Sequence, residues 1–180
     1  MTGRFVSSEF VLKHATAAWE IAGARTLRRD VFCREQRLFD GDDVDDVDDV
    51  AKVLVAIAHV MGMPDRVVGT VRIHESAPHR WLGSRLAVAS EYRRVATLGA
   101  ALIRGAVGTA RARGAARFLA TVQPRNRALF ERLAWTAIGD AIGDAIVAGV
   151  PHLLMEATLE AYAPCFEETF ARVPTLRRAS

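Results

Sequence analysis

The chain has 180 residues, a length that suits one domain with a core of its own. Hydrophobic residues make up 51% of it and charged residues 25%, which excludes a disordered or fibrous protein. No apolar run approaches the roughly 20 residues that a membrane helix needs, and the first residues do not read as a signal peptide. We therefore expect a cytoplasmic protein that does not contact membranes.

The formal net charge is +3, and of the 24 basic residues only Lys13 and Lys52 are lysines. Arginine favours bidentate contact with phosphate or carboxylate, so the composition is compatible with nucleic acid, with an anionic cofactor, or with a codon bias alone. Five arginines lie between residues 111 and 127 without interleaved aromatic residues or a known motif. We therefore do not expect them to bind nucleic acid. They are Arg111, Arg113, Arg117, Arg125 and Arg127.

The first third of the chain predicts a strand, a helical region and a hairpin. Residues 9–16 alternate between apolar and polar side chains well enough for a strand. Residues 17–35 have an incomplete helical pattern of apolar residues, which Gly23 could divide into two helices. After an acidic loop, residues 52–60 and 66–75 read as two strongly apolar strands. A short turn separates them, which indicates a hairpin.

The middle of the chain predicts a strand–helix–strand unit. Residues 76–84 read as a loop and residues 85–90 as a strand. Residues 98–113 have an amphipathic helical pattern that Gly114 ends, and residues 116–123 read as a buried strand. Such a unit implies a parallel pair of strands within a mixed sheet.

The last part of the chain predicts a short helix at 127–134 and two final antiparallel strands at 135–147 and 151–160. We expect one domain over residues 1–160. The remainder, 161–180, reads as a tail with a short helix around "CFEETFARV". The final hairpin offers a sheet edge through which a homodimer could form.

An acidic run between the first helical region and the first hairpin invites a metal interpretation. An EF-hand loop needs Gly at its sixth position and Glu at its twelfth, whereas a frame that starts at Asp40 has Asp45 and Ala51 there. We interpret the run as a solvated surface, attached to the body by the three valines within it. A rim that attracts a cationic amine remains an alternative. The aspartates of the acidic run are Asp42, Asp43, Asp45, Asp46, Asp48 and Asp49.

The loop before the helix at 98–113 combines small residues with positive charge. A helix N-terminus presents unpaired N–H groups and a partial positive charge, and therefore binds phosphate. Arg93 and Arg94 add charge, and small residues let the backbone approach an anion. An ordinary strand-to-helix connection is the alternative. The small residues are Ala96, Thr97, Gly99, Ala100 and Ala101.

This loop resembles the coenzyme A-binding motif of the GCN5-related N-acetyltransferases (GNAT), Arg/Gln-x-x-Gly-x-Gly/Ala. In "AVASEYRRVATLGAALI", Arg94 takes the Arg/Gln position, Thr97 the first Gly and Gly99 the last. Further on, "NRALFERLAW" resembles the stretch of the family that begins with Asn, where Asn126 matches and Phe130 stands at the usual Tyr. The resemblance covers about residues 8–160.

The resemblance implies an α/β fold of the α+β kind, a GNAT-like single domain. Its sheet would be mixed and mostly antiparallel, with about six or seven strands, a splayed parallel pair at the centre and about four flanking helices. "LRRDVFCREQRLF" with the Asp-rich loop further resembles a subgroup of these enzymes and, more distantly, acyl-homoserine-lactone synthases.

The resemblance also implies where acetyl-CoA would bind. Leu86, Ala87 and Val88 would contact the pantetheine arm and the thioester, and a backbone N–H near Val88 would polarise the thioester carbonyl. Asn126 and Phe130 would lie beside the arm. The pyrophosphate would be held by Arg93, Arg94, Val95, Ala96, Thr97, Leu98, Gly99 and Ala100.

Two residues depart from the family pattern. Thr97 in place of Gly demands a negative φ in the loop, or some strain. Phe130 cannot return a proton to the leaving thiolate as a Tyr would, although water could serve. A general base would take the proton of the amine, and the candidates are Glu35, His74 and Glu91. The histidines lack metal-binding spacing, so we expect no metal.

The resemblance therefore implies an acetyl-CoA-dependent N-acyltransferase. A primary amine of a small molecule, which could be cationic, would attack the thioester directly in a ternary complex. Two alternatives remain open. One is an acyl-CoA-binding module with weak or lost catalysis. The other is an enzyme like the acyl-homoserine-lactone synthases that uses S-adenosylmethionine.

Overall fold

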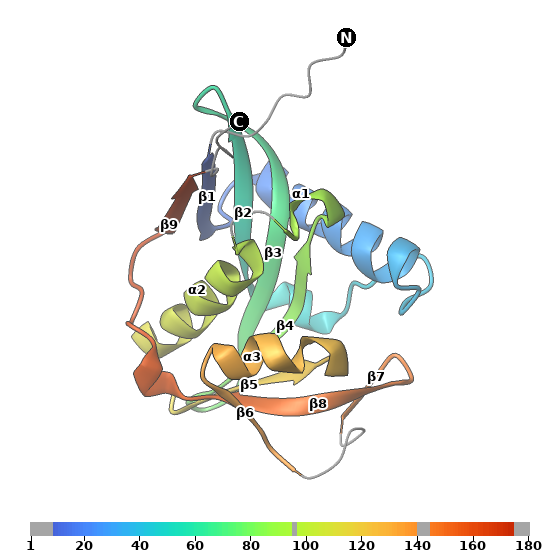
Figure 1. Cartoon of the computed structure of the whole chain (residues 1–180), viewed down its shortest axis with the longest axis vertical. Coiled ribbons are helices and arrows are strands. Elements are labelled where there is room, and N and C mark those ends of the chain that lie inside the picture. The colour runs from blue at the N-terminus through green and yellow to red at the C-terminus, as the bar shows by residue number, and fades with distance from the viewer. Residues whose placement is uncertain (1–8, 95–96, 140–144, 175–180) are drawn as a thin grey trace.

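A mixed sheet with helices on both faces forms the protein in the computed structural model, which describes residues 9–94, 97–139 and 145–174 (Figure 1). The helices are α1 (Ala18–Arg28), which continues as a π-helical segment (Arg29–Glu35), α2 (Leu98–Ala112) and α3 (Arg127–Arg132). The strands are β1 (Glu9–His14), β2 (Lys52–Val60), β3 (Met63–Ala77), β4 (Arg80–Val88), β5 (Arg117–Val122), β6 (Trp135–Ala137), β7 (Ala145–Val147), β8 (Val150–Ala157) and β9 (Thr169–Pro174).

The strand order is β6-β8-β5-β4-β3-β2-β1-β9, and β7 pairs with β8. Among the described strands β4 and β5 form the one parallel pair, and the other pairs are antiparallel. This confirms the predicted fold class. The sheet has more strands than expected because the end of the chain contributes β6 and β7 separately, together with β9.

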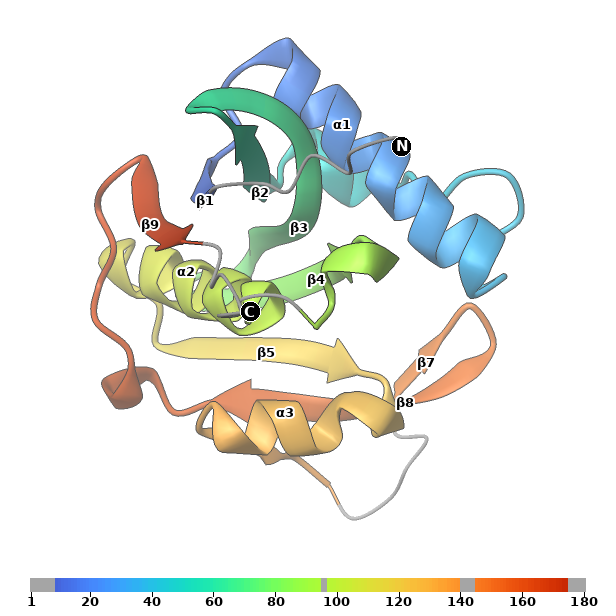
Figure 2. The same ribbon diagram turned by 45° about the horizontal axis from the view of Figure 1, so that its top comes forward.

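Two clusters of buried residues pack between the sheet and its helices, with α1 over one face of the sheet and α2 over the other (Figure 2). β2 has five consecutive buried residues, as expected for a strand covered on both faces. Its Leu54 and Ala56 belong to the cluster under α2 and α3, while Val55 and Ile57 belong to the cluster under α1. The two faces of the sheet are therefore the α1 face and the α2 face.

The expected break of the first helix at Gly23 does not occur. α1 runs without interruption from Ala18 to Arg28, and a Cβ at Gly23 would lie only 2.8 Å from Cγ2 of Val67. The glycine thus lets α1 approach β3 closely. Glycine costs a helix about 1 kcal/mol relative to alanine, and the close packing of α1 on β3 offsets this cost.

The prediction of a helix around residues 165–173 is wrong, because this part of the tail includes strand β9. β9 pairs antiparallel with the outer edge of β1, with Glu9 opposite Pro174. Phe170 lies over α2 at Gly105, where a Cβ would come within 2.3 Å of the ring. The free edge of β1 and the space that Gly105 leaves for Phe170 therefore favour a strand over the helix that the local sequence pattern predicts. The domain boundary at residue 160 stays a prediction.

The loop expected at residues 76–84 is also mostly strand. β3 extends to Ala77 and β4 already begins at Arg80, so a tight turn joins them. Arg80 pairs with Ala77 and Trp81 with Glu75.

The acidic run is only in part the solvated surface that the sequence predicts. Four of its six aspartates are exposed, but Asp43 is 2% exposed and the side chain of Asp48 is 4% exposed. Val44 and Val50, in contrast, are 49% and 71% exposed. Two of the valines therefore face outward, whereas two of the carboxylates face the sheet.

Three arginines from three elements pair with these carboxylates. Arg28 of α1 lies 2.9 Å from Asp43 and donates to Asp48 at 2.9 Å. Arg72 of β3 donates two hydrogen bonds to Asp45, at 2.6 and 2.7 Å. The third arginine is Arg85 of β4, described below. We call these six side chains the Arg–Asp network: Arg28, Arg72, Arg85, Asp43, Asp45 and Asp48.

We predict that Asp48→Asn lowers the free energy of unfolding by about 3 kcal/mol, because it leaves the buried charges of Arg28 and Arg72 without one of their partners. Burial opposes ionisation of Asp48, but hydrogen bonds from Arg28, from the backbone at Asp45 and from Arg72 outweigh it and hold its pKa below the usual range. The folded pKa lies below the unfolded one. The contribution is therefore full above about pH 4 and is lost as the pH falls through the folded pKa.

Urea denaturation at pH 7 and at a series of acidic pH values checks this prediction. The control is Asp46→Asn in the same loop, where the side chain is exposed and the cost should stay within about 0.5 kcal/mol. Equal costs for the two variants would contradict a structural role for the network.

Candidate active site

The parallel pair β4–β5 opens along its length, as predicted. The two strands pair only from Arg80↔Arg117 to Gly83↔Ala120. Beyond that point residues 84–88 pair with β3 alone, and residues 121–122 pair with β8 alone. The backbone edges of β4 and β5 that face this opening have no strand partner in the described structure.

A β-bulge bends β4 at the start of the opening. The register changes between Arg72↔Ser84 and Thr70↔Ala87, so two residues, Arg85 and Leu86, oppose one on β3. Arg85 has a φ of 54°, in the left-handed region that costs a non-glycine residue about 1 kcal/mol. Such a bulge bends the strand, here at the point where β4 and β5 part.

The Arg–Asp network holds Arg85 in this conformation. Its Nε lies 2.9 Å from the Asp43 carboxylate, and an Nη donates to the Asp43 carbonyl at 3.1 Å. The guanidinium also lies 4.3 Å from the centroid of the Phe39 ring. Burial lowers the pKa of Arg85. The contacts that bury the acidic loop therefore also fix the bulge.

A cavity of about 150 Å³ passes through the sheet at the opening. Successive strand residues point to opposite faces, so Ala120 and Val122 face α2, whereas Thr121 and His152 face α1. On the α2 face the wall is apolar. On the α1 face it includes polar groups. The apolar side includes Ile103, Ala106, Phe118, Ala120, Phe130 and Trp135, and the polar side includes Gln36, Ser84, Arg85, Thr121, Gln123 and His152.

A second pocket of about 340 Å³ adjoins this cavity. The two share Gln36, Leu86 and Asn126. The second pocket is lined by seven of the residues that the sequence assigns to acetyl-CoA, and Phe130 lines the first. The predicted residues that line the second pocket are Leu86, Ala87, Val88, Arg93, Gly99, Ala100 and Asn126.

The remaining predicted cofactor residues lie around the start of α2. Arg94 and Thr97 are exposed and Leu98 is 1% exposed in the core, while Val95 and Ala96 lie outside the described residues. Thr97 has a φ of 53°, so of the two alternatives for this position the strained one is found. For a β-branched residue this conformation costs roughly 1–2 kcal/mol.

The start of α2 is suited to an anion. Ala101 donates to the Thr97 carbonyl at 3.0 Å, which leaves the N–H groups of Leu98, Gly99 and Ala100 without an acceptor inside the helix. A Cβ at Gly99 would meet only Cγ2 of Val88, at 3.9 Å. The site thus has room for a side chain, and glycine there keeps the backbone open to a ligand.

Two predicted residues with separate roles are paired with each other. Arg93, predicted to bind phosphate, donates two hydrogen bonds of 2.6 Å to Glu35, a predicted base. Its Nε also donates to the Val88 carbonyl at 2.9 Å. The hydrogen bond from Arg93 holds the pKa of Glu35 below its usual range. Glu35 therefore has little capacity to take a proton near neutral pH.

None of the three predicted bases, Glu35, Glu91 and His74, lines the cavity. Glu91 accepts a hydrogen bond of 2.8 Å from Arg66; hydrogen bonding from its own backbone N–H and then from its neighbours lowers its pKa. His74 lies opposite Leu82, where β4 and β5 are still paired, and burial lowers its pKa. Their catalytic roles stay predictions, as does that of Glu35.

Sequence reasoning missed His152, which lines the cavity and is 4% exposed. Its Nδ1 lies 2.8 Å from the Val150 carbonyl. A carbonyl only accepts hydrogen bonds, so Nδ1 donates and Nε2 holds the lone pair. Among the described residues that line this cavity, His152 is the one with a side chain that commonly serves as a general base. A lone histidine in an apolar strand has no motif, and only the strand register places it here.

No Asp or Glu is present among the described residues that line the two pockets. Three carboxylates of the acidic loop already pair with arginines. The loop therefore gives no support for the cationic acceptor that the sequence allowed.

The family match agrees with this geometry. The model of the acetyltransferase (GNAT) family matches residues 24–135, a span that includes the π-helical segment, the bulge, the start of α2 and Phe130. The chain belongs to the GNAT acetyltransferase family. No curated protein sequence matches it.

Solved structures share the fold at low sequence identity. A protein from Lactobacillus plantarum described as an N-acetyltransferase superposes with a TM-score of 0.70 at 22% identity, over 83% of this chain and 98% of the other. An acyl-CoA N-acyltransferase from Pseudomonas aeruginosa gives 0.64 at 21%, over 83% and 99%. The CoA-dependent acyl-homoserine lactone synthase BjaI, with S-adenosylmethionine and isopentyl-CoA, gives 0.63 at 21%, over 81% and 82%.

Within residues 9–94, 97–139 and 145–174, no helix is long and apolar enough to cross a membrane. The same residues contain no group of three His, Cys, Asp or Glu side chains placed to hold a metal ion.

We predict that Gly99→Asp abolishes micromolar binding of coenzyme A, because the new carboxylate would meet the pyrophosphate at the start of α2. The same carboxylate favours the helix, since negative charge at an N-terminus adds about 0.3–1 kcal/mol. Calorimetric titration measures the loss of binding, and thermal unfolding measures the folded state.

Gly99→Asn is the matched control, because it has the same shape without the charge. It should retain binding within about tenfold of the wild type, a difference of about 1.4 kcal/mol. Undiminished binding to Gly99→Asp would contradict the placement of the pyrophosphate.

Proposed function

We propose that this GNAT protein transfers an acyl group, acetyl in the simplest case, from coenzyme A to a primary amine of a small molecule, by direct attack in a ternary complex. The observation that supports this most is the cavity through the sheet at the β4–β5 opening. A donor that enters from the second pocket and an acceptor on the α1 face would meet at Leu86 and Asn126.

The open edge of β4 supports the placement of the donor. Residues 84–88 expose backbone groups toward the opening, and amide groups of a pantetheine arm can pair with them as an added strand would. A backbone N–H next to the bulge would then donate to the thioester carbonyl oxygen. Such a donor stabilises the negative charge that develops on that oxygen during attack.

His152 is the proposed proton acceptor. The neutral amine attacks the thioester carbon, its N–H proton passes to Nε2 of His152, and the C–S bond breaks. The products are an amide and the coenzyme A thiolate. Since Phe130 has no hydroxyl, the thiolate takes its proton from water. A thiol has a pKa near 8.5, so this step requires no strong acid.

The walls on the α1 face suggest the kind of acceptor. They combine the apolar side chains of Leu38 and Phe39 with uncharged polar groups such as Ser84 and Thr121. Gln123 bridges the opening there by donating to Gln36 at 2.7 Å. An amine with an apolar part fits these walls better than a polycation does.

We predict that His152→Gln lowers kcat by about 100-fold, in line with the loss of one general base, while the Kd for acetyl-CoA changes little. Release of free thiol from acetyl-CoA, over a panel of primary amines, measures the rate.

Glu35→Gln separates the two candidate bases. If Glu35 is the base, this variant loses the acidic limb of the pH profile and His152→Gln retains it. Acetyl-CoA binding without thiol release for any amine would instead favour the alternative of a binding module.

A further inference from the structure

We infer that the site takes an acyl group larger than acetyl: a short apolar chain of about four to six carbons, held in the cavity against its apolar wall on the α2 face. This inference rests on the proposed function and names the donor class of the same site.

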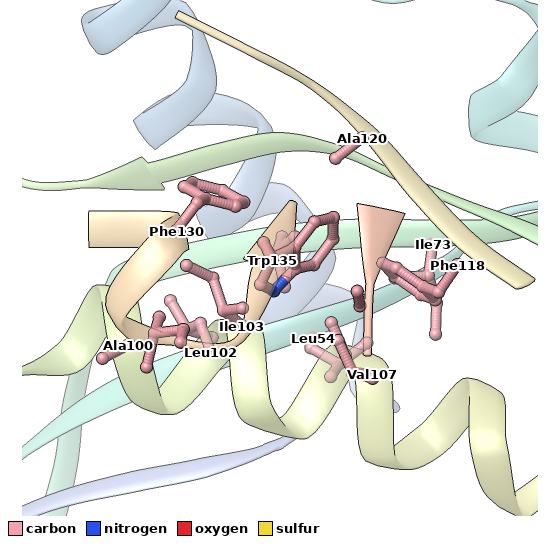
Figure 3. Packing of buried hydrophobic residues seen from close by; sticks show 14 of the residues in the cluster. Leu54, Ile73, Ala100, Leu102, Ile103, Val107, Phe118, Ala120, Phe130 and Trp135 are labelled. Carbon is pink, nitrogen blue, oxygen red and sulfur yellow. The ribbon is translucent and has the colours of Figure 1, made fainter. Parts of the chain in front are cut away.

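The walls on this side form an apolar enclosure from four elements. Ile103 comes from α2, Phe118 from β5, Phe130 from α3 and Trp135 from β6. The Trp135 ring meets Phe130 edge-on with centroids 5.0 Å apart, and Phe118 at 5.6 Å. Figure 3 shows the rings of Phe130 and Trp135 beside Ile103.

Of these four wall side chains only Trp135 has a polar atom, and this atom is already paired. The indole N–H of Trp135 donates to the hydroxyl of Tyr162 at 3.0 Å, and Phe130 has no hydroxyl. A water molecule needs two to four polar partners, so an enclosure of this kind stays dry and accepts apolar groups. An acyl chain that binds here therefore does not have to displace ordered water.

Small residues create the space. Ala106 on α2 and Ala120 on β5 are both buried and line the cavity. At Gly83 a Cβ would come within 3.0 Å of Phe118. An engineered apolar cavity of about 150 Å³ binds benzene, and the whole passage, counted over both faces of the sheet, has about this volume, so it has room for several carbons. The methyl group of an acetyl thioester would leave most of it unfilled.

The gain in affinity per carbon can be estimated. Each buried methylene strengthens binding about fourfold, so hexanoyl-CoA should bind at least about tenfold more tightly than acetyl-CoA even if only part of the chain is buried. Ala120→Leu fills the enclosure from β5 and should reduce this ratio to about threefold or less. Ala120→Gly enlarges the enclosure and should preserve or increase the ratio.

Calorimetric titration of CoA, acetyl-CoA, butyryl-CoA and hexanoyl-CoA into the wild type and the variants tests the inference. Thermal unfolding checks that each variant folds, and Ala120→Val provides a smaller change if Ala120→Leu does not fold. Equal Kd values for acetyl-CoA and hexanoyl-CoA in the wild type, or weaker binding of the longer chain, would overturn the inference while leaving the proposed function intact. Failure of every thioester and of CoA to bind would overturn both.

Discussion

The Arg–Asp network is the constraint on which the candidate site depends. It ties α1, β3 and β4 to the acidic loop through Arg28, Arg72 and Arg85. Buried ion pairs contribute little net stability, because removing charges from water costs about as much as their attraction returns. What this network provides is position. It holds Arg85 in a left-handed conformation and thereby fixes the bulge at which β4 leaves β5.

The opening converts a sheet, normally a barrier between two faces, into a passage. One face presents aromatic and aliphatic side chains, whereas the other presents Gln, Ser, Thr and His side chains. A thioester and an amine differ in the same way, since one has an apolar acyl group and the other must lose a proton. Approach from opposite faces would bring the reacting atoms together without competition for one surface, and this saves much of the entropy of a bimolecular reaction.

Much of the fold could be predicted from local patterns. β2, α2 and β5 are long enough for their periodicity to be decisive, and the order of strand, helix and strand implies the parallel pair. The acidic loop could not be predicted, because a run of aspartates does not reveal partners such as Arg72 and Arg85, which are remote in sequence. β9 depends on the free edge of β1, which local helical periodicity in the tail cannot anticipate.

The site was predicted in the same uneven way. Residues of the loop and strand with motif support, such as Val88 and Gly99, do lie beside one pocket. The pairing of Glu35 with Arg93 spans 58 positions, and the placement of His152 depends on the register of β8 with β5 and β7. Neither leaves a signal in a single sequence. Chemistry that arises from long-range register is therefore the part that requires the structure.

The central claim is that the β4–β5 opening holds the donor with its thioester at the bulge. A crystal structure of the protein with a non-hydrolysable acyl-CoA analogue tests it most directly. The account predicts the pantetheine arm between β4 and β5, the pyrophosphate at the start of α2 and the acyl group against Phe130 and Trp135. An analogue bound elsewhere, with the opening unoccupied or closed, would contradict it.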